Sequence, residues 1–126
     1  MYFGLSEEQQ SLENSIKRYL EDNASLDTIK AVAGGDKETA EKVHQGLIDL
    51  GISSLLVPEK YGGLELDMLF ASVVSGALGS GTAPVPFTGT YVMAPLALSL
   101  AGSEVQKDYW LPKIAGGEKI IGIGLS

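Results

Sequence analysis

Paired signals for the start and end of helices recur along this chain and constrain its fold more than any other feature. Ser6 followed by Gln9, and Ser103 followed by Gln106, have the spacing of capping boxes, in which each side chain bonds the other residue's backbone N–H at a helix start. Gly51 stands where one helical pattern stops, because glycine readily adopts the left-handed conformation that ends a helix. These signals predict a series of short helices.

Apolar residues at helical spacing fill the first segments between these signals. The pattern predicts helices over about 7–22, from Ser25 to Gly34, and from Asp36 to Gly51. Ser25 and Asp36 are residue types that cap helix N-termini.

Three more helices are predicted in the second half of the chain. The segment "DMLFASVVSGALG" is apolar on nearly every face and has glycines at its end, which is typical of a helix buried at the centre of a bundle. A helix over about 87–100 contains Pro95, which must kink or restart it. The last helix runs through "EVQKDYWL".

The tail "KIIGIGLS" changes from the helical period to a period of two. Ile121, Ile123 and Leu125 alternate with glycines, which is a strand pattern, but no partner strand is evident elsewhere in the sequence. The predicted fold class is therefore all-α. We expect a bundle of about six helices over residues 1–119, followed at 120–126 by the first strand of a β domain that the chain does not contain.

The composition excludes several classes of function. With 16 acidic and 9 basic residues, the net charge of -7 repels a phosphate backbone, so nucleic acid is not an expected partner. The absence of cysteine and the single histidine, His44, exclude thiolate and multi-histidine metal sites. No apolar run approaches the roughly 20 residues of a membrane span, and the N-terminus has no targeting pattern, so we expect a cytoplasmic protein.

Four stretches, in their order and spacing, resemble the N-terminal helical region of the acyl-CoA dehydrogenases. They are "LSEEQQSL", "LGISSLLVPEKYGGLEL", "AGSEVQKDYWLPKIAGGEK" and "IGIGLS", and together they cover the whole chain. The resemblance implies a longer flavoenzyme, in which a β domain and a C-terminal helical bundle follow, and which assembles as a homo-oligomer. It also implies FAD as cofactor, an acyl-CoA thioester as substrate and an electron-transfer partner.

The same resemblance implies α,β-dehydrogenation of the thioester. In the family a carboxylate base removes the α-proton while the β-hydride passes to the flavin. That base belongs to the C-terminal domain, so we expect no catalytic residue in this chain. We also expect no metal ligand. The alternative is a non-catalytic partner subunit, or a helical interaction module, of a heteromeric dehydrogenase.

One set of site residues is carried over by position to the tail. The tail matches a family segment that contacts the flavin: Ser126 takes the place of a hydroxyl residue, and Ile123 and Leu125 precede it near the isoalloxazine edge. The competing interpretation is that these are ordinary strand residues.

A second set lies in "PVPFTGTYVMAP", which matches the helix start that lines the far end of the acyl pocket. Phe87, Thr90 and Tyr91 stand at positions i, i+3 and i+4, so they share a helix face that can meet an acyl tail. Plain core packing is the competing interpretation of such a stripe.

Two departures from the family pattern leave the acyl specificity open. Many members have tryptophan where His44 stands, and many have a Glu-Glu-Leu-Gly-like run where this chain has "GALGS". The loss of those carboxylates gives weight to the non-catalytic alternative. We interpret His44 as a polar residue on a helix face rather than as an acid or base.

The connector "GISSLLVPEKYGGLEL", residues 51–66, has two interpretations. Gly62 and Gly63 permit positive φ, Pro58 fixes φ, and the apolar run before Pro58 can anchor the segment in the core. It is either a structural turn between helices or part of the pocket wall beneath a flavin, and the sequence alone does not separate the two.

Overall fold

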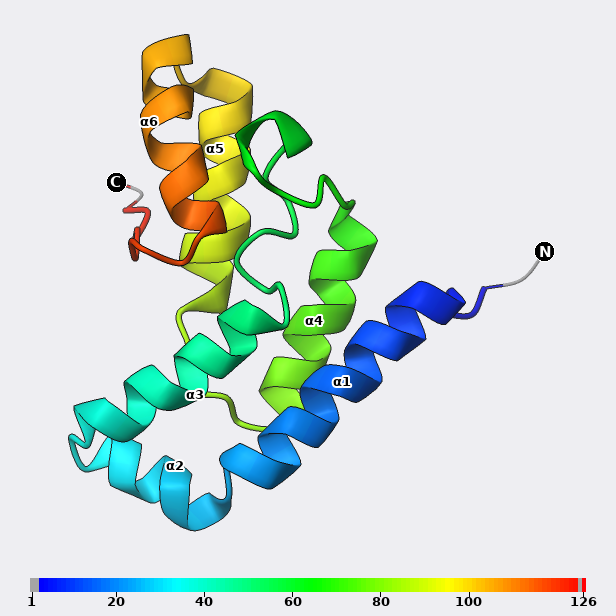
Figure 1. The fold of residues 1–126 in the computed structure, drawn as a ribbon, viewed down its shortest axis with the longest axis vertical. Coiled ribbons are helices and arrows are strands. Elements are labelled where there is room, and N and C mark those ends of the chain that lie inside the picture. Colours follow the sequence, from blue (N-terminus) through cyan, green and yellow to red (C-terminus); the bar gives the residue numbers. More distant parts are fainter. Residues whose placement is uncertain (1–2, 125) are drawn as a thin grey trace.

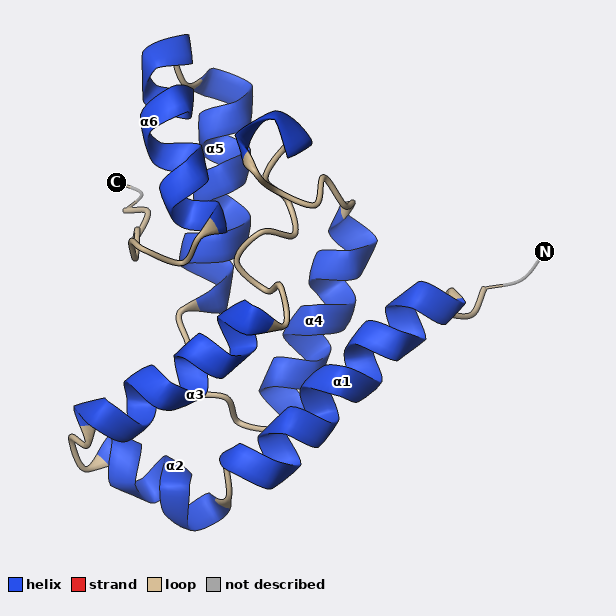
Figure 2. Cartoon of the chain, in the orientation of Figure 1, coloured by secondary structure: helices blue, strands red, loops and turns tan. Residues whose placement is uncertain are grey.

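The computed structural model describes residues 3–124 and 126, and these residues form six α-helices and two shorter helical turns (Figure 1). The prediction of an all-α fold with about six helices is confirmed. Figure 2 shows helices joined by loops, with no strand among the described residues. The elements are α1 (Glu7–Asn23), α2 (Leu26–Ala33), α3 (Lys37–Asp49), η1 (Glu59–Tyr61), α4 (Met68–Ser80), η2 (Thr88–Met93), α5 (Ala94–Ala101) and α6 (Glu104–Ala115).

Both predicted capping boxes are present. The Gln9 backbone N–H donates to the Ser6 hydroxyl at 3.2 Å, and the Ser6 N–H donates to the Gln9 side chain at 3.0 Å. At the start of α6, Ser103 and Gln106 form the same pair of bonds at 3.2 and 2.9 Å. Each box satisfies two backbone donors that have no partner within the helix.

The helices pack in two groups that meet at the connector (Figure 1). Helix α1 packs against α4 and α3, with α2 beside α3, while α5 and α6 form a pair at the other end of the molecule. Ile16 of α1, Leu47 of α3 and Val74 of α4 are fully buried in one core. Burying each of these side chains stabilises the fold by about 1.5–3 kcal/mol relative to leaving it exposed.

Helix α4 is covered on one side only. Its buried residues are Ala71, Val74, Ala77 and Leu78. Met68 and Leu69, in contrast, are 51% and 66% exposed, so the described residues leave part of this apolar helix uncovered. The helix also continues through Gly79 to Ser80, because Gly81, rather than Gly79, is its C-terminal cap.

The connector is a compact turn with its own backbone hydrogen bonds. Leu64 N–H donates to the Ser54 carbonyl, and Leu66 N–H to the Leu55 carbonyl, each at 2.8 Å. Gly62 has a φ of +85°, as predicted for this glycine pair. Gly63 does not have a positive φ. Glycine is required there for another reason, because a Cβ at this position would collide with the Val57 carbonyl oxygen.

The predicted strand at 120–126 is not formed by the described residues of that segment. A strand needs a neighbouring strand to bond its backbone N–H and C=O groups, and the described residues provide none. The boundary at residue 119 between a helical and a β domain stays a prediction. Separately, no helix in the described part of the chain has the length and apolarity needed to cross a membrane.

The helix predicted over 87–100 is interrupted at its start, as its proline requires. Residues Thr88–Met93 form the π-helix η2, and Pro95 follows as the second residue of α5. The Ala94 N–H donates to the Gly89 carbonyl, five residues back. The wider turn fits the position of Pro95, which has no N–H to continue the usual pattern.

Candidate functional site

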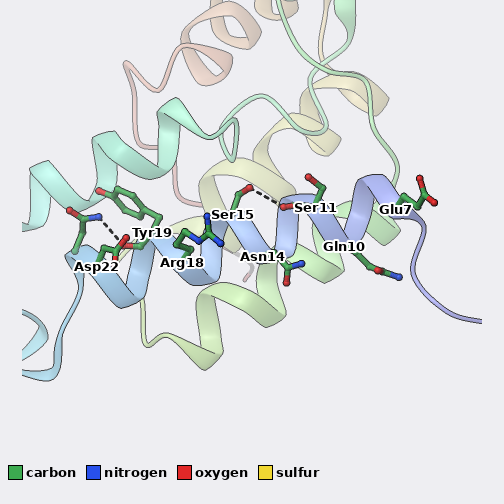
Figure 3. Close-up of a pocket in the computed structure, with 9 residues that line it drawn as sticks. Glu7, Gln10, Ser11, Asn14, Ser15, Arg18, Tyr19 and Asp22 are labelled. Atoms are coloured by element: carbon green, nitrogen blue, oxygen red, sulfur yellow. Dashed lines mark hydrogen bonds between the residues drawn. The ribbon is translucent and has the colours of Figure 1, made fainter.

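A polar groove of about 600 Å³ runs along α1 (Figure 3). The groove is lined by Glu7, Gln10, Ser11, Asn14, Ser15, Arg18, Tyr19, Asp22 and Asn23. The Ser15 hydroxyl donates to the Ser11 carbonyl, and the Asn23 amide to the Tyr19 carbonyl, each at 2.9 Å. In Figure 3 the labelled side chains spread along the helix and do not converge on one point. This groove is the solvent-facing side of an amphipathic helix.

A second hollow, of about 540 Å³, lies between the end of α4 and the start of η2. It is lined by Ser75, Leu78, Gly79, Thr82, Ala83, Val85, Pro86, Phe87, Thr88 and Gly89. None of these residues is charged. The walls offer apolar side chains with three hydroxyl groups, a lining that suits an uncharged, largely apolar ligand.

Strained backbone borders this hollow. Thr82 has a φ of +51°, which is rare for a β-branched residue, and its N–H donates to the Gly79 carbonyl at 3.0 Å. The π-helix η2 begins at Thr88, which also lines the hollow. Left-handed non-glycine residues and π-turns are both concentrated at functional sites. Their meeting at one hollow makes it the candidate functional site.

Glycine keeps the hollow open on the side of α4. A Cβ built on Gly79 meets no heavy atom within 4 Å, so a larger side chain there would extend into the hollow. Gly76, one turn earlier, has the same free space but does not line the hollow. Substitutions at Gly79 and Gly76 therefore form a matched pair that tests whether the hollow binds a ligand.

The structure separates the three residues predicted to face an acyl tail. Phe87 lines the hollow, although only 5% of it is exposed. Thr90 and Tyr91 do not line it and are buried in the domain, at 1% and 0% exposure. Thr88 and Gly89, which helical spacing did not single out, line the hollow instead. Helical spacing identified the shared face but not the direction in which it points.

The side chains of Tyr91 and His44 are joined by a hydrogen bond. The Tyr91 hydroxyl lies 2.8 Å from the His44 Nε2 atom, which joins η2 to α3. Burial lowers the pKa of His44 and raises the pKa of Tyr91, so both side chains favour their neutral forms. This pair explains why His44 sits on the inner edge of α3. No spacing in the sequence indicated it, because the two residues are far apart along the chain.

Thr90 is bonded to the tail. Its hydroxyl donates to the Ile121 carbonyl at 2.9 Å and accepts from the Ile121 N–H at 3.3 Å. A Cβ on Gly89 would lie 3.8 Å from the same carbonyl oxygen. The tail therefore passes directly behind the wall of the hollow.

The residues predicted to contact a flavin follow Ile121, the tail residue that Thr90 anchors. Ile123 is 36% exposed and Ser126 is exposed, so both are accessible at the surface. Leu125 lies outside the described residues. Contact between these residues and a flavin stays a prediction.

Comparison with known proteins places the fold and the sequence in one family. The sequence model of the acyl-CoA dehydrogenase N-terminal domain matches residues 6–118. The (2S)-methylsuccinyl-CoA dehydrogenase of Cereibacter sphaeroides is 30% identical over 91% of this chain and 21% of that protein. The mitochondrial isovaleryl-CoA dehydrogenase of Pongo abelii is 26% identical over 98% of this chain and 30% of that protein.

Two solved structures share the fold. The ChsE4-ChsE5 complex from Mycobacterium tuberculosis matches with a TM-score of 0.75 at 22% identity, over 94% of this chain and 30% of that one. An acyl-CoA dehydrogenase complexed with FAD from Bacillus anthracis matches with a TM-score of 0.72 at 22% identity, over 93% and 20%. The chain thus spans less than a third of the length of these proteins.

Proposed function

The chain belongs to the acyl-CoA dehydrogenase family, whose N-terminal domain matches residues 6–118, and we propose that the whole protein is an FAD-dependent acyl-CoA dehydrogenase. In this proposal the described residues form its N-terminal helical domain. The reaction is the α,β-dehydrogenation of an acyl-CoA thioester, with the catalytic base supplied by another part of the protein.

The uncharged hollow beside η2 is the observation that supports an acyl-binding site in this domain. We propose that it receives the far end of the acyl chain, because its lining is apolar or hydroxyl-bearing and contains no charged side chain. Phe87, Thr88 and Gly79 form its wall in this proposal. Thr90 and Tyr91 support that wall from behind, through Ile121 and His44.

The described tail fits one edge of a flavin ring but not a whole FAD. Ile123 is accessible, and the backbone groups of residues 122–124 form no hydrogen bond with any other described residue. The sequence contains no glycine-rich phosphate loop, so the pyrophosphate needs other groups. We propose contacts from Ile123, Leu125 and Ser126 only. When bound, FAD would supply the hydride acceptor of the reaction.

We propose a homo-oligomer that passes electrons to a separate electron-transfer protein and resides in the cytoplasm. The exposed apolar residues at the start of α4, Met68 and Leu69, are available for contact with other parts of the whole protein or with another subunit.

The test is anaerobic titration of the purified whole protein with a panel of acyl-CoA thioesters, followed by its visible absorbance. We expect a flavin spectrum that is bleached by at least one acyl-CoA. A flavin-containing protein that no acyl-CoA reduces would contradict the proposed activity. Protein that lacks flavin and copurifies with a second dehydrogenase chain would instead support the non-catalytic alternative.

A further inference from the structure

The Thr90 side chain hydrogen-bonds both the backbone N–H and the backbone C=O of Ile121 in the tail. The Thr90 hydroxyl donates to the Ile121 carbonyl at 2.9 Å and accepts from the Ile121 N–H at 3.3 Å, across 31 residues of sequence. A hydroxyl can do this with one oxygen atom, because that atom both donates and accepts. The hydroxyl therefore satisfies both backbone hydrogen-bonding groups of Ile121.

The anchor is rigid on the side of the helix. Thr90 is 1% exposed, and its branched Cβ restricts its rotamer. The adjacent Tyr91 is bonded to His44, so the same turn of η2 is also fixed to α3. Ile121 packs against the core. The tail thus leaves the domain from a fixed point, and residues 122–124 have no other hydrogen bond to described residues.

We infer that Thr90 is a positioning residue for the flavin site. It sets the path along which the chain leaves Ile121 toward Ile123 and Ser126, the residues proposed to touch the flavin edge. The inference rests on the proposed function, and it assigns to Thr90 a role through the tail rather than contact with the acyl chain. Loss of the hydroxyl leaves the two Ile121 backbone groups without a partner among the described residues and releases the tail.

Three variants of the whole protein test this inference. Thr90→Val keeps the size and branching of the side chain and removes the hydroxyl, whereas Thr90→Ser keeps the hydroxyl. Ser99→Ala is the control, because the buried Ser99 hydroxyl forms no hydrogen bond among the described residues and lies on the adjoining helix α5. The two readouts are the flavin dissociation constant, measured with free FAD, and amide hydrogen exchange at Ile121.

We expect Thr90→Val to weaken flavin binding and to accelerate exchange at Ile121, each by roughly tenfold, the effect of about one buried hydrogen bond. Thr90→Ser should restore both, and Ser99→Ala should change neither. Unchanged exchange at Ile121 in Thr90→Val would overturn the anchor. Faster exchange with unchanged flavin affinity would overturn the positioning role.

The same experiment separates this inference from the proposed function. Wild-type protein that binds no FAD would contradict the proposed function and the positioning role together, while the exchange measurement would still decide on the anchor. Wild-type protein that binds FAD, with Thr90→Val behaving identically in both readouts, would overturn only the inference about Thr90.

Discussion

The Nε2 atom of His44 and the hydroxyl oxygen of Tyr91 lie 2.8 Å apart and join α3 to the π-helix η2. Their rings are also in contact, with centroids 5.8 Å apart. Because burial keeps both groups neutral, the bond joins two uncharged side chains, and it holds η2 at the turn that carries Thr90.

The stability of the chain should fall at mildly acidic pH through His44. Its pKa is lowered from the usual 6.5 because burial disfavours the imidazolium, so below about pH 6.5 the unfolded chain binds more protons than the folded chain. The contribution is therefore fully present above pH 6.5 and is lost as the pH falls through the folded pKa. Urea denaturation at several pH values, followed by circular dichroism, measures this loss.

His44→Gln is the control for this prediction. Since His44 is the only histidine, the variant should lose the part of the pH dependence that arises between pH 5 and 7. The difference in unfolding free energy between wild type and variant should shrink as the pH falls. Parallel curves for the two proteins would show that the folded pKa of His44 is not lowered.

Gly46→Ala should destabilise the chain by about 1–3 kcal/mol, because a Cβ there collides with the Tyr19 side chain. The Tyr19 hydroxyl donates to the Val43 carbonyl at 3.1 Å, so moving the ring away would break that bond. Gly76→Ala is the control. It has free space, and it should stabilise α4 by about 0.5–1 kcal/mol. Equal stability of the two variants in urea would refute the close packing of α1 on α3.

Gly63→Ala should cost more stability than Gly62→Ala, although both glycines lie in the same turn. Gly62 is left-handed, so alanine there costs about 1–2 kcal/mol. Alanine at Gly63 meets the Val57 carbonyl, which is backbone and cannot rotate away, so we expect about 3 kcal/mol. The urea midpoints of the two variants decide the order, and the reverse order would contradict the structure of the connector.

The sequence was sufficient to predict where α1, α2, α3 and α6 begin, because those signals are local. Ser6, Ser25, Asp36 and Ser103 all cap helices as expected, since capping depends on residues within one turn. The all-α fold class followed from these positions.

The long-range features were not predictable in the same way. Thr82 is left-handed although its residue type disfavours that conformation, and Tyr91 and Thr90 point inward because their partners lie in α3 and the tail. The tail at 120–126 forms no strand among the described residues, because alternation of apolar residues does not supply a partner strand, and its place in a β domain stays a prediction. These long-range contacts orient the residues around the hollow, so from the sequence only Phe87 was identified as part of its wall.

The most direct test of the account compares Gly79→Leu with Gly76→Leu in the whole protein, by anaerobic reduction of its flavin with acyl-CoA thioesters of increasing chain length. Both leucines replace exposed glycines of α4, but only the one at position 79 lines the hollow. We expect Gly79→Leu to lower reduction by the longest accepted chains roughly tenfold or more and to spare the shorter ones, while Gly76→Leu should match wild type. An unchanged chain-length profile in Gly79→Leu would contradict the proposal that the hollow receives the acyl chain.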